Sequence, residues 1–320
     1  MRVLLLFALL FVAVFLLAPF WGTETLSPVI FWSQESLEWK IFLNYRLPRV
    51  LLGLLAGGCL AVCGMVFQAV FRNPLATPFT LGTASGAAFG VSLAILCGTI
   101  PLLPAAFFGA LLSLVLVFAI AKSSGRCGGT EMLLSGIAVS FVFSSLIMLT
   151  QYLSDPTQTV RMLRWTMGGL DRGGLETVLK LLPWVLPALG ILWGMSRELD
   201  LFCIGEEVAS ARGMNVTRSR WILLLTTSFL VGTIVSVCGP IGFIGLMIPH
   251  IGRILAGASH RMLFLISFLG GGALLGLCDT FSRTLIAPDE IPVGILTALL
   301  GGPFFIGLLI LSSRVTMGEK

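Results

Sequence analysis

The chain has 320 residues, of which 57% are hydrophobic and 11% are charged, and its formal net charge is +5. Soluble domains carry about 25% charged residues, so this composition excludes an ordinary soluble protein. Since a membrane-spanning helix needs about 20 apolar residues, about ten spans fit into the chain and leave only short loops. We therefore expect an all-α, polytopic membrane protein with a single transmembrane domain over residues 1–320.

Apolar runs that are broken by charges, proline and glycine predict the spans in chain order. The first half gives spans near 3–21, 47–71, 81–98, 103–122 and 132–153. The second half gives spans near 180–197, 221–238, 241–254, 262–281 and 291–311. The first run has the length of a secretory signal, but no A-x-A cleavage site follows it, so we favour an uncleaved first span.

The stretch from Trp221 to Gly252 decides how often the chain crosses the membrane. It holds 32 residues with no acidic or basic residue except His250. As one helix it would be about 48 Å long, well beyond a hydrocarbon core of about 30 Å. Arginines flank both ends, and arginines beside spans favour the cytoplasm. Two short crossings hinged at Gly239 and Pro240 fit better, which gives ten spans and places both termini in the cytoplasm.

Glycines and cysteines indicate how the spans pack. Glycines at four-residue spacing let helix backbones approach in lipid, although some such spacings arise by chance in a chain with 37 glycines. They occur at Gly53/Gly57, Gly82/Gly86/Gly90 and Gly272/Gly276. The seven cysteines lie in or beside apolar runs without a C-x-x-C pair. We interpret them as packing residues and predict no metal site and no cofactor in this chain.

Two absences from the sequence narrow the function. Ion-coupled carriers keep ionisable residues inside the membrane, whereas here each Asp, Glu, Lys and Arg can be placed near a span end. The phosphate-binding pattern G-x-x-x-x-G-K-[ST] does not occur, so the chain cannot hydrolyse ATP by that mechanism. An ion-coupled secondary transporter and an intramembrane enzyme are therefore disfavoured alternatives. Gln68 and Asn73, in or just beyond the second span, suit either an interhelical hydrogen bond or contact with substrate in the pathway.

A structured cytoplasmic segment is expected at about residues 200–220. Glu206 and Glu207 suit the first turn of a short helix, Arg212 its last turn, and Gly213 a left-handed cap. The pattern predicts a short helix, a turn and the start of the next span. Such a segment is either a docking surface for another subunit or a solvated loop.

The outer side of the chain offers a second candidate surface. Residues 155–167 are typical of a helix that starts at an Asp-Pro pair and stops before two glycines. Trp165 on this helix fits an interfacial anchor, and the helix is either plainly interfacial or receives a partner. Arg46 and Arg283 lie at outer span ends, where exposed guanidinium groups can pair with carboxylates of a docking protein or with lipid head groups.

Five stretches of the chain resemble, in order, the permease family of type II ABC importers for iron-siderophores, haem, cobalamin and some oxyanions. The resemblance extends over nearly the whole chain between residues 40 and 311, and the five stretches mark it. They are RLPRVLLGLLAGG (Arg46 to Gly58), FRNPLATP with LGTASGAAFG (Phe71 to Gly90), GEEVASARGMNV (Gly205 to Val216), GPIGFIGLMIPHIGR (Gly239 to Arg253) and IPVGILTALLGGPFF (Ile291 to Phe305).

The resemblance implies the assembly and the cargo. It implies a homodimer in the bacterial inner membrane, with two cytoplasmic ATPase subunits that bind ATP-Mg and a periplasmic or lipid-anchored substrate-binding protein. Membrane lipid is a further expected partner, and no nucleic acid partner is expected. The cargo is an iron chelate, with a siderophore favoured and haem or cobalamin next.

The resemblance also implies roles for particular residues. Arg46 and Arg283 resemble outer arginines that meet acidic residues of the binding protein. The cytoplasmic gate is expected around Gly128, Gly129 and Thr130. The segment near residues 205–213 resembles the coupling helices that sit in the cleft of the ATPase. The residues expected to couple to the ATPase are Gly205, Glu206, Glu207, Ala209, Arg212 and Gly213.

Overall fold

The computed structural model describes residues 2–22, 36–123, 129–257 and 259–318, and all regular structure in these ranges is helical. Seven helices are long and apolar enough to cross a membrane, and three further apolar helices are shorter. Together they match the ten predicted spans. Their bounds are α1 (Arg2–Leu17), α3 (Leu47–Val70), α4 (Thr83–Cys97), α5 (Leu102–Ser123), α6 (Gly129–Leu153), α8 (Leu175–Gly194), α11 (Val216–Cys238), α12 (Ile244–Ala256), α13 (His260–Thr284) and α14 (Val293–Gly318).

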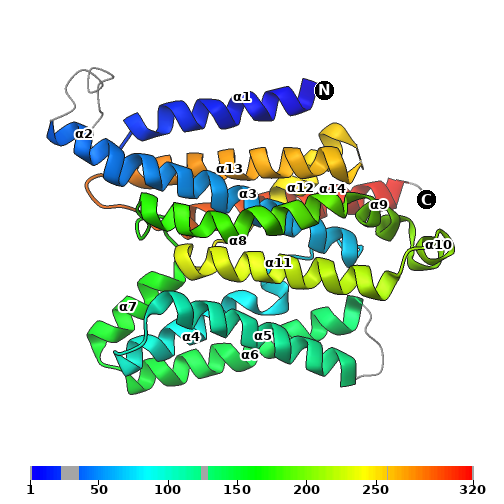
Figure 1. Cartoon of the computed structure of the whole chain (residues 1–320), viewed down its shortest axis with the longest axis horizontal. Helices are drawn as coiled ribbons and strands as arrows, with labels where there is room; N and C mark the ends of the chain where they lie inside the picture. The colour runs from blue at the N-terminus through cyan, green and yellow to red at the C-terminus, as the bar shows by residue number, and fades with distance from the viewer. Residues whose placement is uncertain (1, 23–35, 124–128, 258, 319–320) are drawn as a thin grey trace.

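Four short helices and three tight turns of the described residues lie at the ends of the long helices, and one of these turns is the 3-10 turn η4 (Pro78–Leu81) before α4. The 3-10 turn η1 (Ala18–Phe20) follows α1, and the π-helical turn η3 (Phe42–Arg46) joins α2 to α3. The short helices are α2 (Leu37–Ile41), α7 (Pro156–Thr166), α9 (Ser196–Ile204) and α10 (Glu206–Ala211). In Figure 1, α7 and α2 lie at one end of the bundle, whereas α9, α10 and both chain ends lie at the other, as an even number of crossings requires.

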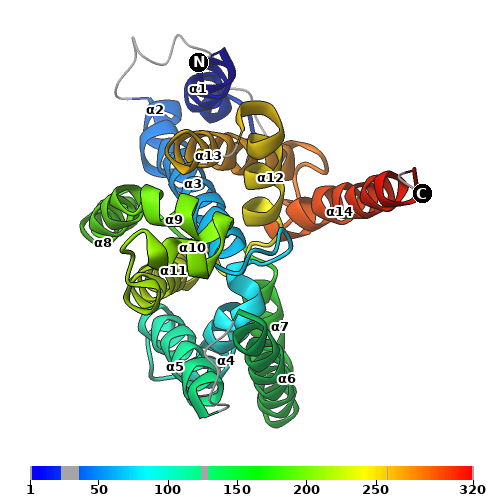
Figure 2. The same cartoon turned by 90° about the vertical axis from the view of Figure 1, so that its right-hand side faces the viewer.

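Helix α3 is the centre of the bundle, with most of its residues buried. It packs against α11, α12 and α13, while α4, α5 and α6 form a second group at the side (Figure 2). Glycine allows the closest approach, because a Cβ on Gly57 would come within 2.2 Å of the Gly271 carbonyl oxygen. A Cβ on Gly86 would meet the Gly109 carbonyl oxygen at 2.4 Å. The predicted role of glycine in close helix packing is confirmed at Gly57 and Gly86.

The long apolar run breaks where its length requires a break. Helix α11 ends at Cys238, Gly239 takes a left-handed φ of +68°, and α12 begins at Ile244. The connection is not helical, so α11 and α12 are two separate crossings, as predicted. Phe243 also has a positive φ, +67°, a strained conformation for a residue with a Cβ. Its ring occupies the space left by Gly301 of α14, where an added Cβ would lie 2.1 Å from Phe243 Cγ.

Candidate functional site

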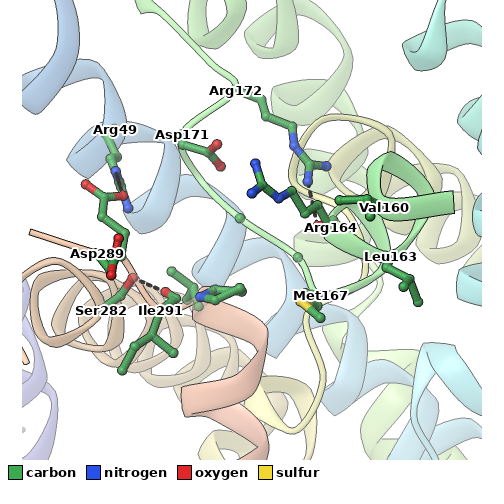
Figure 3. A pocket seen from close by; sticks show the side chains of 15 residues that line it. Arg49, Val160, Leu163, Arg164, Met167, Asp171, Arg172, Ser282, Asp289 and Ile291 are labelled. Atoms are coloured by element: carbon green, nitrogen blue, oxygen red, sulfur yellow. Dashed lines mark hydrogen bonds and ion pairs between the residues drawn. The ribbon is translucent and has the colours of Figure 1, made fainter. Parts of the chain in front are cut away.

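A cavity of about 650 Å³ opens at the end of the bundle that carries α7 (Figure 3). We call it the vestibule. Its walls come from α7, the loop after α7, the loop before α14 and the first turn of α14. Three guanidinium groups and three carboxylates line it, so its charges balance. They belong to Arg49, Arg164, Arg172, Asp171, Asp289 and Glu290.

Helix α7 forms one wall of the vestibule, and its sequence explains its start. Asp155 caps the helix by accepting a hydrogen bond from the backbone N–H of Gln158 at 2.8 Å, which confirms the Asp-Pro start. Val160 and Leu163 are exposed on one side of α7, and both line the vestibule. Trp165 is buried at 3% exposure, so the expectation of an interfacial anchor is wrong. Its ring packs within the protein and lies 5.9 Å from the Arg172 guanidinium carbon.

Arg172 follows α7 and is held beside the vestibule. Its Nη2 donates a hydrogen bond to the Arg164 carbonyl oxygen at 2.9 Å. Partial burial lowers the pKa of Arg172, and the neighbouring Asp171 carboxylate opposes this shift. A guanidinium remains protonated at neutral pH in either case. Arg172 therefore contributes a fixed positive charge to the vestibule wall.

A buried ionic cluster underlies the vestibule. Arg49 of α3 pairs with Asp279 of α13 at 2.8 Å and with Glu290 at 2.7 Å. Asp279, which is 1% exposed, also lies 3.1 Å from the Arg283 guanidinium. Ser282 donates a hydrogen bond to the Ile291 carbonyl oxygen, which ties the loop before α14 to α13. Sequence reasoning placed Asp279 near a span end and missed that it joins α3, α13 and this loop.

Arg46 and Arg283 differ from expectation because both are buried, at 9% and 4% exposure. Arg46 donates a hydrogen bond to the Phe20 carbonyl oxygen at 3.2 Å, and Arg283 donates one to the Ala18 carbonyl oxygen at 3.4 Å. The expectation of exposed guanidinium groups is therefore wrong. Both arginines satisfy backbone carbonyls of the turn η1 after α1. Their docking role stays a prediction.

The opposite end of the bundle presents the predicted helix, turn and helix start. Gly205 (φ +133°) separates α9 from α10, and Gly213 (φ +83°) follows α10, as the cap prediction required. Asn215 then caps α11 by accepting a hydrogen bond from the Arg218 backbone N–H. Glu206 pairs with Arg220 at 2.5 Å, which fastens α10 to α11. Glu207 is exposed at this end of the protein.

The two faces of α10 have different surroundings. Ala209 is fully buried, and its carbonyl oxygen accepts a hydrogen bond from the Met214 backbone N–H at 3.1 Å. Val208 is 40% exposed, and Arg212 is exposed beside it. One face therefore anchors α10 to the bundle. The other face, with Glu207, Val208 and Arg212, points away from it and is available to another subunit.

His260 connects this end of the protein to the central helices. The Asp200 carboxylate on α9 accepts a hydrogen bond from the His260 backbone N–H at 2.9 Å and lies 2.6 Å from His260 Nδ1. His260 begins α13 and is 1% exposed. Helix α9, which leads into α10, is thereby fixed to α13. Sequence analysis gave His260 no such role, because its partner is 60 residues away.

This contact gives a prediction about energy coupling. Asp200→Ala should leave the His260 hydrogen bonds unmade, and losing one hydrogen bond to a charged group costs about 1.5–3 kcal/mol. We expect substrate uptake per ATP hydrolysed to fall, while the amount of ATPase bound stays unchanged. Asp200→Asn keeps the acceptor oxygen and should behave like the natural protein. Equal uptake per ATP in the two variants would contradict the proposed connection.

The predicted pathway residues have structural partners. Gln68 is buried at 2% exposure, donates hydrogen bonds to the Gly245 and Leu246 carbonyl oxygens, and accepts one from Arg253 at 2.8 Å. The interhelical hydrogen bond left open by the sequence is thus present between α3 and α12. Asn73 accepts a hydrogen bond from the Leu75 backbone N–H in the turn after α3. A substrate contact for either amide stays a prediction.

The expected gate at residues 128–130 falls at the start of α6. Gly128 lies outside the described residues. Gly129 and Thr130 are the first two residues of α6, so the expected gate loop gives way to a helix at Gly129.

The described residues form a bundle of ten apolar helices with a vestibule at one end and an exposed short helix at the other, an architecture that suits a membrane transport subunit. The FecCD transport family matches residues 5–311, and the chain belongs to this family. It is the permease subunit of an ABC importer, and ATP hydrolysis belongs to a separate subunit. The resemblance found in the sequence is confirmed.

Relatives and a solved structure agree with this assignment. The hemin transport system permease protein of Yersinia pestis is 40% identical over 301 residues, which cover 90% of this chain and 89% of the relative. The cobalamin import system permease protein of Halobacterium salinarum is 39% identical over 288 residues, 88% of this chain and 76% of the relative. The inward-facing structure of a metal-chelate type ABC transporter matches with a TM-score of 0.88 and 34% identity, and covers 97% of this chain and 99% of that chain.

Proposed function

We propose that this permease carries a metal chelate across the bacterial inner membrane, with an iron-siderophore as first candidate and haem or cobalamin next. Support comes from the relatives, whose names include hemin and cobalamin, and from the solved metal-chelate type transporter. The single observation that carries the proposal is that α7, which forms one wall of the vestibule, and α10 lie at opposite ends of one bundle (Figure 1). Substrate enters at one end, and the ATPase acts at the other.

The side that carries α10 is proposed to face the cytoplasm, with both termini there. The arginines that flank α11 and α12 support this orientation, because Arg218, Arg220 and Arg253 lie at the α10 end of these helices. Basic residues beside spans favour the cytoplasmic side. The vestibule then faces the external substrate-binding protein. Residues 1–320 are proposed to form one transmembrane permease domain.

A homodimer is proposed to complete the pathway. Helix α14 projects from the body of the protein (Figure 2), and apolar side chains along it are exposed, including Leu299 at 64% and Leu300 at 49%. The first turn of α14 also lines the vestibule. A second copy packed against α14 would therefore cover these side chains and close the pathway around the vestibule.

The external binding protein is proposed to dock on the surface formed by η1 and α7. Arg46 and Arg283 support η1 from beneath, so their contribution is to hold the shape of this surface. Arg161 and Arg164 of α7 are exposed and can form bidentate pairs with carboxylates of the partner. The gate at 128–130 and the pathway contacts of Gln68 and Asn73 are proposed on the family resemblance.

The ATPase is proposed to dock on the exposed face of α10 between Gly205 and Gly213. Two ATPase subunits, one for each copy of the permease, bind ATP-Mg. Their movement reaches the membrane helices through α9 and His260. Since a ligand shifts a conformational equilibrium only by its differential affinity for the two states, the vestibule needs no tight substrate site. Affinity then resides in the binding protein.

Reconstituted transport tests this function. The permease, its ATPase and its binding protein would be placed in liposomes, and uptake of an iron-55 siderophore, haem, cobalamin and molybdate would be compared. We expect ATP-dependent uptake of a metal chelate, lost with an ATPase that cannot hydrolyse ATP. Uptake that persists with the inactive ATPase would indicate a secondary transporter, and uptake of molybdate alone would refute the chelate assignment.

A further inference from the structure

A second cavity lies on the side of the bundle between α5, α8 and α11, away from the vestibule. Its volume is about 670 Å³. Aromatic side chains line it, and Phe107 meets Phe229 edge-on with ring centroids 5.8 Å apart. Trp184 meets Phe229 at 6.2 Å. The three helices are all candidate membrane spans, so the cavity is a groove beside the hydrocarbon of the bilayer.

The groove continues toward the middle of the membrane. A smaller cavity of about 220 Å³ shares Phe107 and Phe229 with it and extends along α5 and α11. Gly232 lines this deeper part and presents no side chain there. Along α11 the two cavities reach from Val237 to Leu225, about 18 Å at 1.5 Å per residue. This length is close to one leaflet, about 15 Å of hydrocarbon, and so suits one acyl chain.

Polar groups gather at the mouth of the groove. Thr177 and Lys180 line it at the start of α8. The Lys180 ammonium lies 2.7 Å from the Glu176 carboxylate, and both side chains are exposed, at 73% and 81%. In the deeper cavity the Ser228 hydroxyl is the one polar side-chain group among the lining residues. Two further hydroxyls line the groove but donate to backbone carbonyls of α11, and they belong to Thr233 and Ser236. Among the described residues, the groove therefore has one lining charge, the Lys180 ammonium at its mouth, with the paired Glu176 carboxylate beside it.

We propose that the groove binds a phospholipid with a zwitterionic amine head group, such as phosphatidylethanolamine. One acyl chain lies along Phe107 and Phe229. There it makes more van der Waals contacts than it would among the mobile chains of the bilayer. The phosphate contacts the Lys180 ammonium, and the lipid amine contacts the Glu176 carboxylate. The bound lipid links α8 to α5 and α11 at the level of the outer leaflet. The inference requires that these helices span the membrane with the α7 end outside, as proposed above, and it is independent of the transported substrate.

Photochemical crosslinking tests the site. The full permease–ATPase complex would be placed in lipid nanodiscs with phosphatidylethanolamine that carries a diazirine in one acyl chain. Crosslinked peptides would be identified by mass spectrometry. We expect crosslinks concentrated around Phe107 and Phe229. Unlabelled phosphatidylethanolamine should compete better than phosphatidylglycerol, which lacks the amine.

Two variants and one control separate a binding site from general lipid contact. Thr233→Phe places a ring in the groove and should reduce these crosslinks about tenfold. The double variant Glu176→Gln, Lys180→Gln leaves the apolar interior intact and should abolish the preference for phosphatidylethanolamine. Leu186→Phe is the control, because Leu186 is 58% exposed on α8 and does not line the groove. Its crosslinks should equal those of the natural protein.

Other outcomes overturn the proposal. Crosslinks spread evenly over the exposed sides of α1 and α8 would show general lipid contact only. Equal competition by the two lipids would refute the head-group assignment. Permease-to-permease crosslinks in the groove would show that a second copy occupies it. If Thr233→Phe does not fold, the double variant decides, since its two side chains are exposed.

Discussion

Arg283→Glu is expected to prevent accumulation of a folded permease. Arg283 and Arg49 together compensate the buried Asp279 carboxylate. Removing one partner of a buried ion pair costs about 3–5 kcal/mol, and the new carboxylate would lie beside Asp279 in a poorly solvated site. The total stability of a protein is about 5–15 kcal/mol, so this change removes a large fraction of it. The measurement is the yield and thermal midpoint of the detergent-purified chain by size-exclusion chromatography.

Matched variants distinguish folding from docking. Arg164→Glu reverses an exposed charge on α7 at the same end of the protein and should leave yield and thermal midpoint unchanged, while the affinity for the loaded binding protein falls. Asp279→Asn combined with Arg283→Gln removes both charges and should be more stable than either single neutral variant. If the Arg283→Glu variant is instead obtained at the yield of the natural protein and binds the external protein poorly, the result would support direct docking by Arg283.

Glu207→Lys is expected to weaken ATPase docking without affecting the fold of the permease. Glu207 is exposed on α10, and substitutions on such surfaces usually change stability by less than about 0.5 kcal/mol. A lost charge contact at an interface should lower affinity about tenfold. The measurement is the dissociation constant of the permease–ATPase complex together with substrate uptake per ATP. Unchanged affinity and unchanged uptake would remove α10 from the docking surface.

Glu206→Lys should act by another route, although it is the adjacent residue. Its carboxylate pairs with Arg220 within the chain, so the new lysine would repel Arg220 and displace α10 from α11. The swap Glu206→Arg with Arg220→Glu restores the opposite charges and should recover most of the ATPase affinity. No charge swap with another residue of the permease should restore the ATPase affinity of Glu207→Lys, because its expected partner is on the ATPase. Failure of the Glu206 swap would show that Glu206 contacts the ATPase directly.

The helices could be predicted from the sequence, because the signals that start and end them lie in the same stretch of chain. The length of the run from 221 to 252 required a break, and the structure places it between Cys238 and Ile244. The cap residues Asp155 and Gly213 marked the ends of short helices. Each of these features depends on one continuous stretch of sequence and on no distant partner. Pattern reasoning therefore recovered both the number of spans and the α9–α10 segment.

Burial of charges could not be predicted in the same way, because it depends on distant parts of the chain. Arg49 and Asp279 are 230 residues apart in sequence, and Arg283 meets the carbonyl oxygen of Ala18 across 265 residues. A span-end arginine looks exposed in a sequence until the segment that covers it is known. The fold was thus predicted more completely than the surroundings of Arg46 and Arg283.

The contact between Phe243 and Gly301 has a consequence for motion during transport. Phe243 lies at the non-helical start of α12, so α12 can tilt relative to α11 without breaking a helical hydrogen bond. Its ring fills the space beside Gly301, and α14 must follow when that ring moves. A tilt of α12 would therefore displace α14 through this contact and strain the hydrogen bonds that join α12 to Gln68 of α3, and the width of the vestibule at α14 would change with it.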